Sequence, residues 1–98
     1  MISNDAHENV LGKSLEALLA ELGAPMKENA FELGANVSEF RIELTNFFDE
    51  DRRRTDPPMI KELTWASAEN HRVTVWFSQS EGGWNALHLL KWHSDDQF

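Results

Sequence analysis

Alternating apolar and polar side chains in the second half of the chain limit its fold more than any other feature. Apolar residues recur at every second position of residues 73–77, which is the period of a β-strand with two distinct faces. One face carries Val73, Val75 and Phe77, and the other carries Arg72, Thr74 and Trp76. Residues 81–83, Glu-Gly-Gly, follow this strand and are typical of a tight hairpin turn. A second strand is therefore expected to return antiparallel over residues 84–93.

Residues 84–93 fit a strand that is apolar on both faces. Their side chains alternate between two sets, Trp84, Ala86, His88, Leu90 and Trp92 on one side and Asn85, Leu87, Leu89 and Lys91 on the other. Most of these residues also form helices readily and none is β-branched, so a helix remains the alternative. The short Gly-Gly turn after a strong strand favours the hairpin.

Three further segments have the composition of strands. Residues 59–66 fit a strand with Met59, Leu63 and Trp65 on one face and Ile60 on the other, before a turn at residues 68–71. In residues 39–48, Phe40 and Ile42 alternate with charged side chains, which predicts a half-buried strand. Residues 26–33 are a candidate for a short strand that ends in a glycine-containing turn. The sheet is therefore expected to hold three to five antiparallel strands.

A single amphipathic helix precedes these segments. Its apolar stripe has helical spacing and consists of Val10, Leu11, Leu15, Leu18, Leu19 and Leu22. Ser14 is a suitable N-cap, and Asp5 with Glu8 is an alternative capping box nearer the N-terminus. Gly23 and Pro25 end the helix, because glycine adopts the left-handed conformation and proline cannot continue a helix. The helix is expected to cover at least residues 14–22.

Together these segments predict one α+β domain over residues 1–98, with the N-terminal amphipathic helix packed on one face of a three- to five-stranded antiparallel sheet, a meander. The expected core combines the helix stripe with the inward faces of the strands: Leu15, Leu18, Leu22, Phe40, Ile42, Val73, Val75 and Phe77. One helix covers only one face of a sheet. The other face would expose large side chains such as Trp76, unless residues 26–33 or the tail to Phe98 cover them. We expect a homodimer formed through the sheet face or the free edge of the C-terminal strands.

The charge of the chain favours some partners over others. The net charge is −8, and residues 1–50 hold ten acidic side chains against three basic ones. Such a surface disfavours binding to DNA or RNA and suits a basic protein partner. No apolar run approaches the length of a membrane span, and the absence of cysteine fits a reducing compartment. No contact with a membrane or nucleic acid is therefore expected, and the expected location is cytoplasmic.

A dense basic run lies at Arg52, Arg53 and Arg54. Guanidinium groups could hold a phosphate or a carboxylate. Four acidic side chains flank the run between residues 49 and 56, so local neutralisation is the simpler interpretation. Residues 49–58 are expected to form an exposed loop, because they include no apolar side chain and end in two prolines.

No motif of a known catalytic, cofactor or metal site occurs in the sequence. His88 and His93 are five positions apart, a spacing that separates their side chains on a strand and on a helix alike. The sequence therefore predicts no metal site, no cofactor and no catalytic residue.

These observations predict a small acidic stand-alone protein-binding module, such as an inhibitor or an immunity-type protein, rather than an enzyme. Its candidate binding residues are Trp76, Trp84, Trp92, Arg52, Arg53 and Arg54. The alternative is a small-molecule-binding protein or enzyme with a Trp-lined pocket between helix and sheet. The positions of the tryptophans separate these hypotheses. A concave pocket with converging polar groups favours the alternative, whereas a flat patch favours protein binding.

Overall fold

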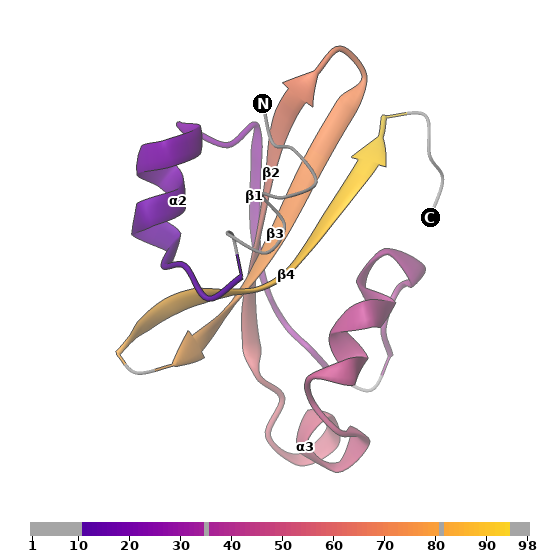
Figure 1. Ribbon diagram of the computed structural model, residues 1–98. Helices are drawn as coiled ribbons and strands as arrows, with labels where there is room; N and C mark the ends of the chain where they lie inside the picture. The colour runs from indigo at the N-terminus through magenta and orange to yellow at the C-terminus, as the bar shows by residue number, and fades with distance from the viewer. Residues whose placement is uncertain (1–10, 35, 81, 95–98) are drawn as a thin grey trace.

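The computed structural model describes residues 11–34, 36–80 and 82–94 and places them in an α+β fold (Figure 1). Four strands form one antiparallel sheet in the order β1-β2-β3-β4, which is a meander. The strands are β1 (Lys27–Glu32), β2 (Met59–Ala68), β3 (His71–Ser80) and β4 (Gly83–His93). The helices are α2 (Leu15–Leu22), the 3-10 helix η1 (Glu39–Asn46) and α3 (Glu50–Thr55). The predicted fold class is confirmed, and residues 84–93 are a strand.

Helix α2 begins and ends where its sequence predicts. The Ser14 side chain caps the helix by accepting a hydrogen bond from the N–H of Ala17 at 3.1 Å. Gly23 ends it with a φ of 81°, and its N–H donates to the carbonyl of Leu19. Glycine adopts this left-handed backbone without the penalty that a Cβ imposes. The alternative capping box at Asp5 and Glu8 lies outside the described residues.

The Ser14 cap gives a first testable expectation. Replacing Ser14 with alanine removes the acceptor of the Ala17 N–H and should lower the free energy of unfolding by about 1 kcal/mol. Replacing Ser14 with aspartate keeps an acceptor and should cost no more than a few tenths of a kcal/mol. Chemical denaturation of the three proteins measures both changes. Equal losses in the two variants would contradict a capping role for this side chain.

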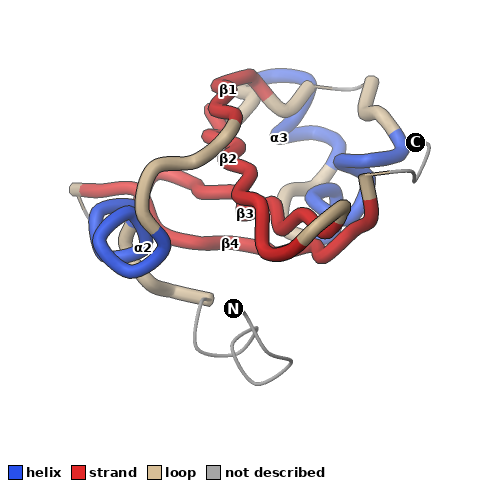
Figure 2. The backbone as a smooth tube through the Cα atoms, turned by 90° about the horizontal axis from the view of Figure 1, so that it is seen from above, coloured by secondary structure: helices blue, strands red, loops and turns tan. Residues whose placement is uncertain are grey.

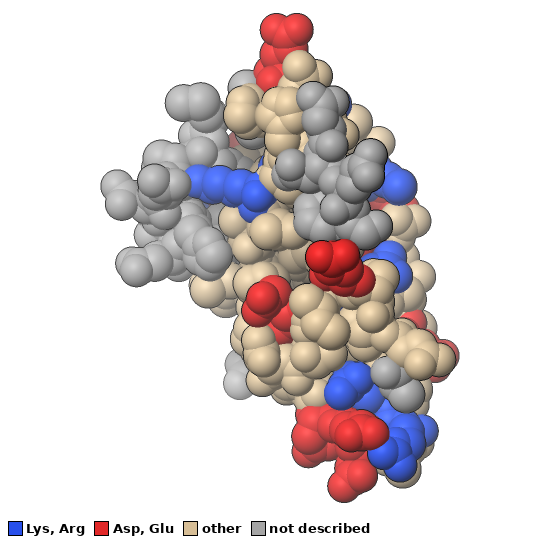
Figure 3. All heavy atoms as spheres, turned by 90° about the vertical axis from the view of Figure 1, so that its right-hand side faces the viewer, with Lys and Arg blue, Asp and Glu red and all other residues tan. Residues whose placement is uncertain are grey.

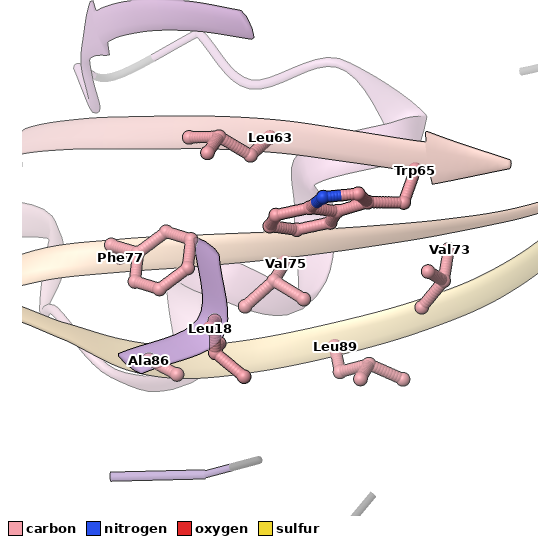
Figure 4. Packing of buried hydrophobic residues seen from close by; sticks show 8 residues of the cluster. All are labelled: Leu18, Leu63, Trp65, Val73, Val75, Phe77, Ala86 and Leu89. Carbon is pink, nitrogen blue, oxygen red and sulfur yellow. The ribbon is translucent and has the colours of Figure 1, made fainter. Parts of the chain in front are cut away.

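One face of the sheet packs against α2. Its buried residues are Leu18, Leu63, Trp65, Val73, Val75, Phe77, Ala86 and Leu89, which we call the α2-side core. Figure 4 shows Leu18 beside Ala86 of β4, with labelled side chains of β2 and β3 in the same cluster. Leu15, Leu19 and Leu22 pack against this core. The predicted pairing of Leu15, Leu18 and Leu22 with the apolar face of β3 is confirmed. Leu11 precedes the helix and is exposed, and Val10 lies outside the described residues.

The opposite face is covered by the segment between β1 and β2, on the other side of the sheet from α2 (Figure 2). The buried residues between this segment and the sheet are Leu33, Leu44, Ile60 and Trp76, which we call the η1-side core. Trp76 is only 1% exposed. The expectation that this face lies open to a second copy of the chain was therefore based on a wrong assumption, because the chain covers the face itself.

Residues 39–48 are not the predicted strand, because most of them form η1. Phe40, Leu44 and Phe48 pack against or within the η1-side core, so this segment turns apolar side chains toward the sheet without joining it. Ile42, predicted to be in the core, is 48% exposed. Phe40 and Leu44 are four positions apart, a spacing that occurs on one face of a strand and also in helical turns. So short an apolar pattern does not distinguish the two structures. Phe40 therefore belongs to a different core from the one predicted.

The charged segment at residues 49–58 is also not wholly a loop, because α3 forms within it. Asp49 caps α3 by accepting a hydrogen bond from the N–H of Arg52 at 2.7 Å. Acidic residues occupy the first turn and arginines the last, which complements the helix dipole. In Figure 3, acidic and basic side chains lie next to one another at this end of the molecule.

Strand β4 contains a bulge that changes which residues face each side. Trp76 pairs with His88 but the next residue, Phe77, pairs with Ala86, so Leu87 is an extra residue without a partner in the register. The bulge corrects the predicted alternation. Ala86 and Leu89 lie in the α2-side core, whereas Leu87 and Leu90 pack against the η1-side core. One strand thereby supplies apolar side chains to both layers.

No helix within the described residues is long and apolar enough to cross a membrane.

Candidate functional site

The η1-side face of the sheet has an apolar half and a polar half. The η1-side core fills the apolar half. The polar half, toward the β2–β3 turn, holds a pocket of about 460 Å³. Its lining includes Lys27 and Asn29 from β1, Glu62 and Thr64 from β2, Arg72 from β3 and Trp92 from β4. Met26, Ser38, Phe40 and Arg41 complete the walls.

Strand register explains why these side chains meet. Asn29 pairs with Glu62, and Glu62 pairs with Trp76, so these three residues form one row across the sheet. Lys27, Thr64 and Thr74 form the next row on the same face. Side chains two positions apart on a strand share a face. The two rows therefore form adjacent parts of one polar surface.

Glu62 is the centre of the first row. It is 6% exposed, and its carboxylate accepts hydrogen bonds from Arg41 Nε at 2.8 Å, Arg41 Nη2 at 3.0 Å and Trp76 Nε1 at 2.7 Å. Burial raises the pKa of Glu62, but hydrogen bonds from Arg41, Trp76 and Asn29, with the charge of Arg41, outweigh it and lower the pKa. Glu62 is therefore a carboxylate at neutral pH and its oxygens are occupied.

Arg41 is held in place on two sides. Its guanidinium carbon lies 3.7 Å from the centre of the Phe31 ring, and its bidentate pair with Glu62 ties η1 to β2. A guanidinium has five N–H donors, and Glu62 uses two of them. In the described part of the chain the other three have no acceptor, and Arg41 lines the pocket. A fixed arginine with unused donors is suited to hold an anion.

A chain of hydrogen bonds crosses the second row. Trp92 Nε1 donates to Thr74 Oγ1 at 2.9 Å, and the oxygens of Thr74 and Thr64 are 2.7 Å apart. Thr74 is fully buried and has no other acceptor among the described residues, so its own proton points to Thr64. Thr64 must then donate its proton elsewhere, and it lines the pocket. The chain therefore makes Thr64 a hydrogen-bond donor to the pocket.

The pocket is a basic site on an acidic chain. Of the residues that the structure describes, Lys27, Arg41 and Arg72 line it with one carboxylate, that of Glu62, so the formal charge of this lining is +2 where the whole chain has −8. Lys27 and Arg72 form no ion pair with any residue that the structure describes. Their charges are thus not neutralised within the described fold.

The tryptophans predicted to bind a ligand or partner lie on both faces of the sheet. Trp92 lines the pocket, and Trp76 supports it from beneath through Glu62. Trp84 packs against the α2-side core, where Lys61 Nζ lies 4.7 Å from its ring. These three residues therefore do not form one flat patch.

The three predicted arginines do not converge on a common point. Arg52 lies over the Phe48 ring, Arg53 donates to the carbonyls of Phe48 and Gly34, and Arg54 pairs with Glu50. Arg53 therefore fastens α3 to the loop after β1. The predicted interpretation of local neutralisation fits Arg54 best.

The histidines considered as ligands are also separated. His88 stacks on Trp76 with ring centres 5.6 Å apart, whereas His93 meets His71 at the end of the β3–β4 ladder. Within the described residues, no group of three or more His, Asp or Glu side chains could hold a metal ion.

Sequence reasoning missed Arg41, Glu62 and Thr64. A signal for the last two was present, because both lie on the same face of β2 as the buried Ile60, where apolar residues are expected. Arg41 had no such signal, since it lay on a segment predicted to be a strand. Comparisons with family models, curated proteins and solved structures give no match for this chain.

Proposed function

We propose that the protein binds a small molecule and that the pocket on the polar half of the η1-side face is its binding site. The observation that carries the proposal is the set of polar side chains held in fixed orientations around a concave space of about 460 Å³. Ligand sites in proteins are concave, combine apolar walls with a few placed polar groups, and have volumes of roughly 300–1,000 Å³. The pocket lies between η1 and the sheet, on the side away from α2.

The buried residues beneath the pocket support the proposal further. Glu62, Thr74 and Trp76 are all buried and every one of their polar side-chain groups has a partner. They fix Arg41, Thr64 and Trp92 at the pocket without help from a ligand. A site that is ordered in advance loses less entropy when a ligand binds.

Nuclear magnetic resonance of isotope-labelled protein against a fragment library tests the proposal. Ligands should shift the indole N–H signal of Trp92 together with backbone signals of Asn29 and Thr64, which line the pocket. The indole signal of Trp84 is the internal control, because this ring packs against the opposite face. Shifts that are spread over both faces, or none at all from a diverse library, would contradict a binding site here.

A blocking variant sharpens the same test. Ser38 is exposed at the pocket wall, so replacing it with tryptophan adds bulk there without disturbing either core. Ser38→Trp should abolish the ligand-induced shifts while the thermal midpoint stays near that of the parent protein. Replacing Ser38 with alanine, which leaves the wall open, should preserve binding.

The net charge of −8 still supports the protein-binding hypothesis, with a basic partner or a second copy of the chain. The apolar area that motivated a homodimer through Trp76 is covered within the chain. A cytoplasmic location remains a prediction. Sedimentation at several protein concentrations measures the oligomeric state directly, and a dimer would restore the homodimer as a property of the protein.

A further inference from the structure

We propose that the ligand of this pocket is a small organic oxyanion, a carboxylate or a phosphate attached to a flat apolar body. This inference rests on the proposed function and adds the chemical class of the ligand. It follows from which hydrogen-bonding groups of the pocket are already used and which are free.

The negative charge of the pocket is not available to a ligand. Among the described residues, Glu62 is the only acidic side chain of the lining, and three hydrogen bonds from Arg41 and Trp76 occupy its two oxygens. A cationic ligand would have to displace these donors to reach the carboxylate. Displacement would leave a buried charge without its partners, which is costly.

The donors of the pocket are available. Arg41 has three N–H groups beyond those that bind Glu62, and Thr64 has a hydroxyl proton directed away from Thr74. Arg72 uses one Nη1 bond to the carbonyl of His71 and keeps its other donors, and Lys27 is exposed at the wall. The remaining acceptors, such as the side-chain oxygens of Asn29 and Ser38, are neutral. A ligand that satisfies this set must bring acceptor atoms and negative charge.

The apolar part of the pocket indicates a flat body for the ligand. Trp92 and Phe40 form a wall and contact each other edge to face, with ring centres 5.5 Å apart. Met26 is 56% exposed at the pocket and its flexible side chain can adapt to a bound group. An aromatic body can pack along these side chains while its charged group faces Arg41 and Arg72.

Four probes with one ring system test the class of ligand: naphthoate, naphthyl phosphate, the neutral naphthamide and the cationic naphthylmethylamine. We expect the first two to bind at least about tenfold more tightly than the last two, because one charge-assisted hydrogen bond is worth about that factor. The two anions distinguish a carboxylate from a phosphate ligand. Binding is measured by titration of the Trp92 indole signal, and the advantage of the anions should decrease in high salt.

Four variants, two of which are controls, assign the donors. Replacing Arg72 with glutamine should weaken binding of the anionic probes about tenfold or more and leave that of naphthamide unchanged. Arg54→Gln is the matched control, because it removes the same charge on α3 and outside the pocket. Thr64→Val removes the predicted donor, whereas Thr64→Ser keeps a hydroxyl and should retain binding.

The outcomes separate the two proposals. If all four probes shift the pocket signals equally, the pocket binds small molecules but the oxyanion class is wrong. If the cationic probe binds most tightly, Glu62 is accessible and the class is reversed. If no probe and no library member shifts these signals, the proposed function itself fails. An equal effect of Arg72→Gln and Arg54→Gln would show that net charge, and not this site, controls binding.

Discussion

Replacing Leu18 with alanine is expected to lower the free energy of unfolding by about 2–5 kcal/mol, the range for buried leucines. Leu18 is 1% exposed and is the one fully covered side chain that α2 contributes to the α2-side core. The loss combines the transfer free energy of the deleted atoms with the cavity that they leave. Urea denaturation followed by tryptophan fluorescence measures this change.

Leu11 provides the matched control for this substitution. It belongs to the same predicted stripe, but it precedes the helix and is 42% exposed. Replacing Leu11 with alanine should cost less than about 1 kcal/mol, since most of its surface stays in contact with water. A cost at Leu18 no larger than that at Leu11 would mean that α2 does not close this core.

Removing the guanidinium of Arg41 is the second large effect that we expect. Arg41→Ala should lower the free energy of unfolding by about 2–3 kcal/mol near neutral pH, less than for a fully buried pair because Arg41 is partly exposed. The variant leaves the carboxylate of Glu62 buried without its main partner. Arg41→Met keeps a stem over the Phe31 ring, so it separates the charge from the packing contribution.

The effect of Arg41 depends on pH, and its sign follows from the pKa of Glu62. Hydrogen bonds and the Arg41 charge lower this pKa below 4.5, the usual value, against the effect of burial. The resulting stability is present above the usual value and is lost as the pH falls through the lowered pKa. The difference between parent and Arg41→Met should therefore shrink in acid. Glu62→Gln removes the titrating group, so in proteins that carry it the effect of Arg41→Met on stability should not depend on pH in this way. If the effect of Arg41→Met in the parent protein persists in acid, or is equally large when Glu62 is glutamine, Glu62 is not the group responsible.

Much of the fold could be predicted because several signals agreed. The helix stripe, the Ser14 cap and the Gly23 stop all indicated α2, and the alternation in β3 left little choice of face. Agreement between local preference and tertiary packing is typical of foldable sequences. The apolar residues of segment 39–48 fit both a strand and a helical segment. The segment is helical because its apolar side chains pack against the second apolar face of the sheet, which the sequence alone does not show.

The site could be predicted only in part, because it depends on contacts that the spacing of residues does not encode. Trp92 was identified from its size and position, and it does line the pocket. Arg41 and Glu62 are 21 positions apart and meet only because η1 folds over β2. The role of Thr64 depends on the order of donors from Trp92 through Thr74, which requires coordinates.

The bulge at Leu87 has a consequence for how this chain can vary during evolution. The residues on its two sides are in opposite phase, so Ala86 faces the α2-side core and Trp92 faces the pocket. Loss of the Leu87 codon would remove the extra residue and leave the other residues of β4 opposite their present partners on β3, so Trp92 would stay at the pocket. The η1-side core would lose one packed side chain. A one-codon loss elsewhere in β4 would turn the residues beyond it to the opposite face. The bulge is therefore the place where this strand can shorten without exchanging its two faces.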